Sequence, residues 1–207
     1  MTKESEKETI LAAMGGRRGL LDSGLPPLIF LIAFNVTKDI ESSAGLALVL
    51  LVGVVIYRLI RRQEIQYAIS GIIGVFICAW LANSTGQAQD FYLPGLLTNL
   101  VYGTVYLITI LIRYPLIGLV VGPLIGENLR WRKDSARRAL YTKATWLWVG
   151  LFGLRVLIQY PLYLSGSVNA LGTARFVMGY PLFIFTAWLT WQIIKGGPRL
   201  SEELKPA

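Results

Sequence analysis

Apolar residues along this chain fall in long runs that short polar stretches separate. Six runs are long enough to cross a bilayer, because a helix that rises about 1.5 Å per residue needs roughly twenty apolar residues to span the hydrocarbon core. The pattern therefore predicts an all-α fold, a polytopic membrane helix bundle with about six transmembrane helices. We expect these helices at residues 20–36, 42–60, 66–83, 92–112, 144–164 and 171–194.

The first of these runs is the weakest. Asp22 interrupts it, and Pro26 and Pro27 remove helical hydrogen bonds near its start. Proline is tolerated at the first positions of a helix, so residues 28–36 still form a regular stretch. We keep this run as a span, because omitting it would place one terminus on the opposite side of the membrane.

A seventh apolar segment, residues 114–125, is too short to span. Its twelve residues make about 18 Å of helix, against about 30 Å of hydrocarbon. Gly118, Gly122 and Gly126 recur at four-residue spacing, which would place three glycines on one helix face for close backbone contact. We expect a re-entrant or interfacial segment packed against the bundle, since irregular backbone at membrane depth requires protein to cover it.

The tripeptide Tyr-Pro-Leu occurs three times, with its prolines at Pro115, Pro161 and Pro181. In the simplest interpretation these prolines start or kink helices near the membrane interface, where the tyrosines act as anchors. In the alternative interpretation the kinks open a central cavity.

Composition agrees with a lipid environment. The 207 residues are 54% hydrophobic and only 15% charged, whereas charged residues make up about a quarter of a soluble domain. The net charge of +8 does not indicate nucleic-acid binding, because the charges lie between apolar runs. With no His and one Cys, the chain excludes His-based catalysis, Cys-rich metal sites and intramolecular disulfides. We expect no cofactor, no metal and no catalytic residue.

The basic residues predict the orientation. Seventeen of the twenty Lys and Arg residues fall on one side of six spans, Lys38 lies alone on the other, and Arg155 and Arg175 lie inside spans. Cytoplasmic loops of membrane proteins carry this excess of positive charge. We therefore expect a plasma (inner) membrane protein with both termini in the cytoplasm. The cytoplasmic parts would be an N-terminal tail at 1–19, a basic loop at 126–143 and a C-terminal tail at 195–207.

Two interpretations of the basic loop stay open. Asp134 and Ser135 can cap a short helix that carries basic residues, and plain anchoring on the cytoplasmic side would explain the charge. Alternatively, the loop contacts anionic lipid headgroups or an acidic partner, where each basic residue contributes about 1 kcal/mol. The candidate lipid contacts are Arg130, Arg132, Lys133, Arg137 and Arg138.

Polar residues inside the predicted spans are the most informative. Arg155 lies near the midplane, where an arginine costs about 2.5 to 3.5 kcal/mol on insertion scales. In a structural interpretation, backbone carbonyls freed at proline kinks or neighbouring amides satisfy each guanidinium. In a functional interpretation, two arginines hold an anion such as a lipid phosphate or carboxylate. The candidate intramembrane polar site comprises Arg155, Gln159, Arg175, Asn99 and Asn35.

Four stretches carry a resemblance to a known family. They read Gly-Gly-Arg-Arg-Gly-Leu-Leu-Asp-Ser-Gly-Leu-Pro-Pro, Arg-Arg-Gln-Glu-Ile-Gln-Tyr-Ala-Ile-Ser-Gly, Ala-Thr-Trp-Leu-Trp-Val-Gly-Leu-Phe-Gly-Leu-Arg and Gly-Tyr-Pro-Leu-Phe. In this order they resemble an actinobacterial integral-membrane family catalogued as a domain of unknown function. The resemblance implies a plasma-membrane location and assigns no activity.

A fainter similarity is to the intracellular septation protein A family of bacterial inner-membrane proteins. The shared features are Pro-Leu-Ile-Phe-Leu in the first span, a basic turn with Gln63, and Pro-Leu-Ile-Gly ahead of the large inner loop. Arg155 and Arg175 depart from that pattern. The similarity implies a role in cell division or envelope synthesis, as an analogy of fold order.

Three functional hypotheses follow. The first is a non-enzymatic component that supports envelope or division complexes by packing against other membrane proteins or its own copies. The second is a small transporter or lipid-handling protein with an anion site at Arg155 and Arg175. The third, an enzyme acting on lipid, has the least support, because the predicted spans hold neither paired carboxylates nor His.

Overall fold

The structure is a computed structural model that describes residues 30–60, 66–198 and 200–201. Every regular element within these ranges is a helix, so the predicted all-α class is confirmed. The predicted tail at 1–19 and the first predicted span up to residue 29 lie outside the described residues. The end of that span is described, and residues 30–37 are helical.

The chain divides into two compact units. The first comprises residues 1–94 and 161–176, and the second comprises residues 95–160 and 177–207. Each unit has its own cluster of buried hydrophobic residues. The sequence had predicted one bundle over residues 20–194, without this division.

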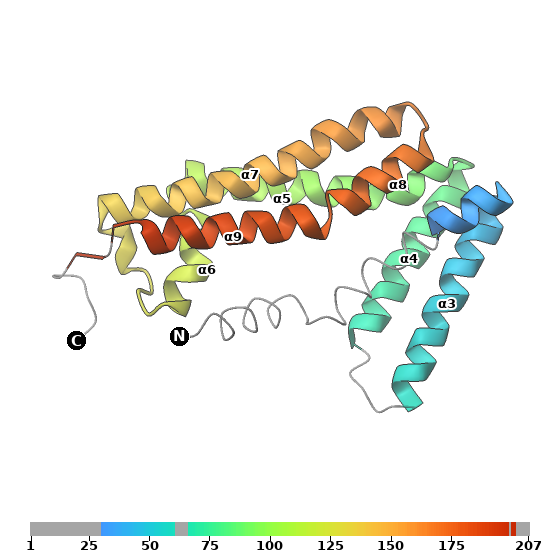
Figure 1. Ribbon diagram of the computed structural model, residues 1–207, viewed down its shortest axis with the longest axis horizontal. Coiled ribbons are helices and arrows are strands. Elements are labelled where there is room, and N and C mark those ends of the chain that lie inside the picture. The colour runs from blue at the N-terminus through green and yellow to red at the C-terminus, as the bar shows by residue number, and fades with distance from the viewer. Residues whose placement is uncertain (1–29, 61–65, 199, 202–207) are drawn as a thin grey trace. The chain divides into compact units, whose positions relative to one another are not determined.

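The described helices of the first unit include α3, α4, η1 and α8. They span Ile40–Ile60, Gln66–Thr85, Ala88–Tyr92 and Val168–Val177, and η1 is a 3-10 helix (Figure 1). The buried residues on the two long helices are small, which lets α3 and α4 pack closely. These residues are Ala44 and Ala47 on α3, and Ala79 and Ala82 on α4.

Aromatic rings close the core of the first unit. Phe30 stacks on Phe91 with the ring centroids 3.7 Å apart and an angle of 2° between the ring planes. Tyr92 meets both rings edge-on, and it is almost fully buried. The segment 30–37 is thereby packed against η1.

The second unit is built from α5, α6, η2, α7 and α9. They span Leu93–Leu111, Leu116–Leu124, Arg130–Arg132, Ser135–Leu164 and Tyr180–Gly196, and the first residues of α5 and the last of α7 belong to the other unit. Within the second unit, α5, α7 and α9 run alongside one another, and α6 projects to one side of them (Figure 1).

Trp148 joins the three long helices of the second unit. Its indole Nε1 donates to Thr190 Oγ1 of α9 at 3.0 Å, and its ring stacks at 5.8 Å on Tyr106 of α5. Phe183 of α9 meets the same indole edge-on, with centroids 5.0 Å apart. An indole N–H buried in an apolar core requires an acceptor, and Thr190 supplies it.

Four described helical stretches are long and apolar enough to cross a membrane. They are Ile40–Tyr57, Ala88–Leu111, Ser135–Leu164 and Val168–Gly196. They coincide with the second, fourth, fifth and sixth predicted spans, and they identify the protein as a membrane protein. The third predicted span is helical as α4, of which Ile73–Thr85 is described as a shorter apolar helix.

The last predicted span is not one continuous helix. α8 ends at Val177, Met178 and Gly179 form a turn, and α9 begins at Tyr180. Pro181 occupies the first turn of α9, where its missing N–H is not needed. The prediction that this proline starts a helix is confirmed. The predicted span over residues 171–194 falls within the candidate membrane span Val168–Gly196, and the structure adds a turn inside it that the apolar sequence does not mark.

The basic loop is shorter than predicted. α7 begins at Ser135, so the last part of the predicted loop 126–143 is already helical. A helix of 30 residues is about 45 Å long, which exceeds about 30 Å of hydrocarbon, so its basic first turns extend beyond the apolar part. The expected separate short helix is therefore the beginning of α7.

Candidate functional site

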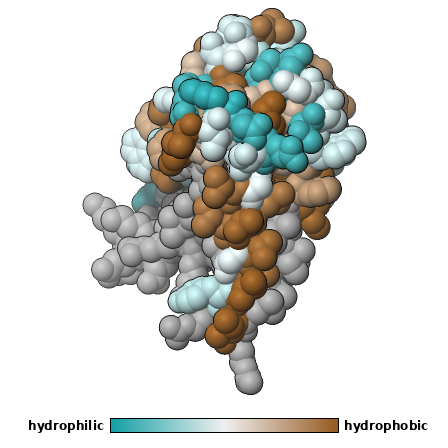
Figure 2. All heavy atoms as spheres, turned by 90° about the vertical axis from the view of Figure 1, so that its right-hand side faces the viewer, coloured by the Kyte–Doolittle hydropathy of each residue, from teal (hydrophilic) through white to brown (hydrophobic). Residues whose placement is uncertain are grey.

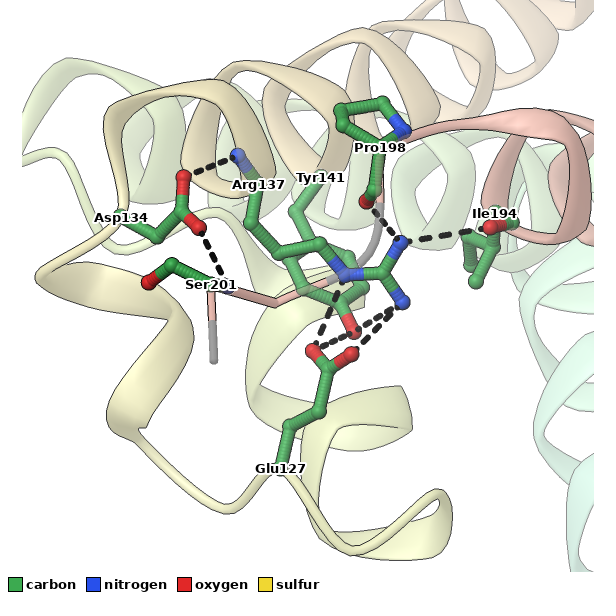
Figure 3. Close-up of polar contacts among 7 residues, drawn as sticks. All are labelled: Glu127, Asp134, Arg137, Tyr141, Ile194, Pro198 and Ser201. Atoms are coloured by element: carbon green, nitrogen blue, oxygen red, sulfur yellow. Dashed lines mark hydrogen bonds and ion pairs between the residues drawn. The ribbon is translucent and has the colours of Figure 1, made fainter. Parts of the chain in front are cut away.

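The start of α7 is fixed by the carboxylate of Asp134. Its Oδ1 accepts from the backbone amides of Ala136 and Arg137, both at 3.0 Å, so the predicted cap is confirmed. Its Oδ2 accepts from the amide of Ser201 at 3.1 Å (Figure 3). These hydrogen bonds, chiefly the one from the Arg137 amide, hold the pKa of Asp134 below its usual range. One carboxylate thus caps α7 and fastens the segment that follows α9.

A buried ion pair lies beside this cap. Arg137 is only 4% exposed, and its Nη2 and Nε contact Oε1 and Oε2 of Glu127 at 2.8 and 3.1 Å. The hydroxyl of Tyr141 donates to the same Oε2 at 2.8 Å (Figure 3). This two-pronged geometry is the strongest form of arginine–carboxylate contact.

The remaining donor group of Arg137 reaches the end of α9. Its Nη1 donates to the carbonyls of Ile194 and Pro198 at 3.3 and 3.0 Å (Figure 3). Carbonyls at a helix end lack partners within the helix, so the guanidinium completes them. Arg137 therefore joins the Glu127 turn, α7 and the end of α9. The sequence had named Arg137 as a lipid contact, but its burial and its partners remove it from that group.

Trp131 is fully buried against the glycine face of α6. A Cβ atom at Gly118 or Gly122 would lie 2.8 or 2.7 Å from the indole, so only glycine leaves room for the ring. The predicted close approach is confirmed at these two positions, although the partner at Gly118 is a side chain. Gly126 does not share this face, because it lies in the turn after α6 with φ +82°.

The other basic residues of this region differ in exposure. Arg130 and Lys133 are exposed, and Arg138 is half-buried. Arg132 is half-buried, and its guanidinium carbon lies 3.7 Å from the ring centroid of Tyr114, a cation–π contact. Of the predicted lipid contacts, Arg130 and Lys133 are the ones that the structure leaves exposed.

Arg155 is held by its own unit. Its Nε donates to the carbonyl of Met178 at 2.9 Å, and its Nη2 donates to that of Gly179 at 2.7 Å. Its Nη1 lies 3.4 Å from Oδ1 of Asn99, the amide that the sequence had proposed as a neighbour. The two carbonyls belong to the turn before Pro181, where the break between α8 and α9 frees them.

Arg175 belongs to the first unit, on α8. Its Nη1 donates to the carbonyl of Tyr92 at 3.3 Å, and its guanidinium carbon lies 5.6 Å from the Tyr92 ring centroid. The hydroxyl of Tyr92 is buried and has no hydrogen-bond partner among the residues that the structure describes. Gly172 leaves room for that hydroxyl, since a Cβ there would lie 2.8 Å from it.

The last two predicted site residues lie elsewhere. Gln159 is buried on α7, one turn beyond Arg155. Asn35 is exposed in the first unit, where it donates to the carbonyl of Leu31 at 3.0 Å and accepts from Lys38 at 3.5 Å. The structure thus brings Arg155 and Asn99 together and places Asn35 and Arg175 in the other unit.

An open hollow of about 710 Å³ marks one end of the first unit. Three connections line it, and all three were predicted to lie outside the cell. Figure 2 shows that the hydrophilic residues gather in the upper part of the face it draws, and that a strip of hydrophobic residues lies below them. The polar lining comprises Lys38, Gln87, Gln89, Ser167 and Asn169.

Comparison with known proteins identifies one family to which the chain is similar. Residues 14–200 match a family described as protein of unknown function, DUF3159. The chain belongs to the DUF3159 family. This finding confirms the predicted resemblance to a domain of unknown function. No curated protein and no solved structure matches this DUF3159 chain.

Sequence reasoning missed several residues of this DUF3159 protein. Half-buried Glu127 and the fully buried Tyr141 and Trp131 form the centre of the basic end, and none of them was proposed as a site residue. One signal was present, because Glu127 is the only carboxylate between Arg113 and Asp134. A single acidic residue within a basic segment often has a specific basic partner.

Proposed function

We propose that this DUF3159 protein is a multi-pass plasma-membrane protein that supports cell-envelope or division complexes by packing against other membrane proteins, without catalysing a reaction. The supporting observation is the bonding of Arg155. Its guanidinium donates to the carbonyls of Met178 and Gly179 in its own unit. The most costly side chain of the predicted spans therefore contributes to the architecture.

The energetics agree with an architectural role. An arginine at the centre of a membrane helix costs about 2.5 to 3.5 kcal/mol. A buried carbonyl without a partner costs about 1 to 3 kcal/mol. The contact between Arg155 and the turn at Met178 and Gly179 offsets both costs and fastens α7 to the start of α9 within the second unit. A turn that is fixed in this way gives α7 and α9 of the second unit a defined surface for packing. The envelope context rests on the sequence similarity to septation proteins.

The proposed orientation places both termini in the cytoplasm. Within each unit, connections that the charge count assigned to one side lie together. In the first unit the three outer connections line one hollow. In the second unit Asp134 and Ser201, both assigned to the inner side, are hydrogen-bonded. This pairing supports the predicted order of membrane crossings.

A second candidate function is handling of an anionic lipid or solute. The observation in its favour is the buried hydroxyl of Tyr92, which has no partner among the described residues and belongs to the residue whose carbonyl binds Arg175. A guanidinium and a hydroxyl together can bind a phosphate or carboxylate oxygen. The site would then rest on Arg175, since Arg155 is engaged within the second unit. Under this function, inorganic phosphate raises the melting temperature of the wild type in detergent, and Tyr92→Phe removes that increase.

The proposed function is tested by Arg155→Ala and Arg155→Lys. An architectural arginine predicts that Arg155→Ala lowers the amount of folded protein in membranes, and that complementation of a deletion strain falls in parallel. Arg155→Lys keeps the charge but cannot reach two carbonyls and an amide with one nitrogen, so it should restore only part of both. Immunoblots of membranes and growth of the complemented strain measure the two quantities.

The matched control is Arg138→Ala, which removes a half-buried arginine of the same helix at its basic end. It should leave protein amount and complementation near the wild-type values. If Arg155→Ala accumulates normally and fails to complement, the arginine acts on a ligand. Movement of a defined solute by the purified protein in liposomes would also overturn the proposal.

A further inference from the structure

The segment from α6 to η2 exposes large apolar side chains. We call residues 116–133 the interfacial loop. Within it Val120, Leu124 and Leu129 are 54%, 78% and 52% exposed. α6 is nine residues long, or about 14 Å, which is far short of the hydrocarbon thickness. The loop therefore offers an apolar surface without crossing the membrane.

Basic residues accompany this apolar surface. Arg130 and Lys133 are exposed at its end, and Arg113 is exposed just before it. The one carboxylate within the loop is that of Glu127, and the ion pair with buried Arg137 neutralises it. The surface is thus apolar and positively charged.

Contacts with the core of the second unit hold α6 in place. The Trp131 indole fills the face of α6 at Gly118 and Gly122, and the amide of Ile117 donates to Thr145 of α7 at 3.3 Å. These contacts fix one side of α6 against the unit. The indole thus fills the inner side of α6, while Leu124 and Leu129 remain exposed.

The position of the loop indicates what it meets. α5 ends at Leu111 and α7 begins at Ser135, and both helices are long and apolar enough to cross a membrane. The loop that joins them consequently begins and ends at one membrane surface. An apolar and basic segment at that level matches the boundary between acyl chains and anionic headgroups.

We propose that the interfacial loop docks on anionic phospholipid. Val120, Leu124 and Leu129 enter the apolar boundary of the headgroup layer, and Arg130 and Lys133 bind lipid phosphates. This inference rests on the chain being a membrane protein, and it is independent of the proposed supporting role. A protein partner would need to supply both an apolar and an acidic surface, whereas an anionic membrane presents both beside the loop.

The test uses the whole chain in lipid nanodiscs. Leu129→Cys, on a Cys78→Ser background, carries an environment-sensitive fluorophore, in discs of phosphatidylcholine with increasing phosphatidylglycerol. We expect the emission to shift to the blue as phosphatidylglycerol is added. The double variant Arg130→Gln, Lys133→Gln should need more phosphatidylglycerol for the same shift. Each removed charge weakens the binding of the loop to the anionic lipid about fivefold.

Two controls separate the sources of the signal. Lys143→Gln removes an exposed lysine of α7 outside the loop and should leave the titration unchanged. Inorganic phosphate added to pure phosphatidylcholine discs should not reproduce the shift. The proposal is overturned if the emission at every lipid composition is that of a label in water. It is also overturned if the double variant needs no more phosphatidylglycerol than the wild type for the same shift. A label at Leu124→Cys repeats the test at a second position, so loss of folding in one variant does not decide it.

Discussion

Glu127, Asp134 and Arg137 show how three charged residues organise the basic end of this protein. Buried Arg137 pairs with half-buried Glu127, and Asp134 caps α7 and binds Ser201. A buried ion pair contributes less to stability than its contacts suggest, because both ions lose their water. Its geometry is nevertheless specific, and here it determines which segments meet at the start of α7.

Replacing Glu127 tests this arrangement. Glu127→Gln leaves the Arg137 charge buried without its counter-ion, so we expect a loss of about 3 kcal/mol in the free energy of unfolding. Thermal unfolding in detergent measures the loss as a lower melting temperature. Glu41→Gln is the matched control, because Glu41 is an exposed carboxylate at the start of α3. Equal melting temperatures for the two variants would contradict the buried pair.

Asp134 gives the basic end a dependence on pH. Its pKa in the folded protein is lowered, mainly by the hydrogen bond from the Arg137 amide, so its stabilising effect is complete above the pKa of an unfolded aspartate. The effect is lost as the pH falls through the lower, folded pKa. We expect the amide resonance of Ser201 to titrate with a midpoint below the usual aspartate range. Asp134→Asn should abolish that titration, and a midpoint at or above the usual range would refute the assignment.

At the scale of elements, apolar runs located the helices well but could not show how they end or pair. The runs predicted α3, α4 and α5 closely, because length and hydropathy determine membrane helices. The break at Met178 and Gly179 has no polar residue to mark it. Its stabilising contact comes from Arg155, far away in the sequence. Predicting Asn99 as a neighbour of Arg155 succeeded because amides are scarce inside spans.

The pairing of Glu127 with Arg137 could not be predicted for a different reason. It depends on the turn after α6, where Gly126 has φ +82° and Asn128 has φ +49°. Left-handed conformations at two nearby positions reverse the chain and bring a residue of the turn back to α7. Spacing along the sequence does not encode that reversal. Glycine spacing did predict a close contact on α6, although it did not identify Trp131 as the partner.

The glycine face of α6 provides the test at this scale. Gly122→Ala would place a methyl group 2.5 Å from the Asn128 carbonyl oxygen and 2.7 Å from the Trp131 indole nitrogen, so the turn after α6, the ring or the helix must shift. Overpacking of this kind costs about 1 to 3 kcal/mol. Gly150→Ala on α7 is the control, because no atom lies within 4 Å of the added carbon, and it should be neutral or slightly stabilising. Urea or thermal unfolding in detergent measures the stability of both variants. Equal stability would contradict the close packing at Gly122.

At the scale of the whole molecule, the two units agree with one pattern of membrane crossings. In the first unit the connections around Lys38, Gln87 and Ser167 share a hollow. In the second unit the loop before α7 and the segment after α9 meet at Asp134 and Ser201. A chain whose crossings alternate in the predicted order would bring these same connections together. The excess of basic residues at one end, together with this order of crossings, supports our proposal that the basic end of this membrane protein lies in the cytoplasm.

Accessibility of single cysteines in intact cells tests that claim most directly. Gln87→Cys and Lys133→Cys, each on a Cys78→Ser background, are treated with a membrane-impermeant maleimide before and after permeabilisation. The account predicts that Gln87→Cys reacts in intact cells and that Lys133→Cys reacts only after permeabilisation. The reverse result would contradict the orientation, and equal reactivity of both positions in intact cells would contradict a membrane crossing between them.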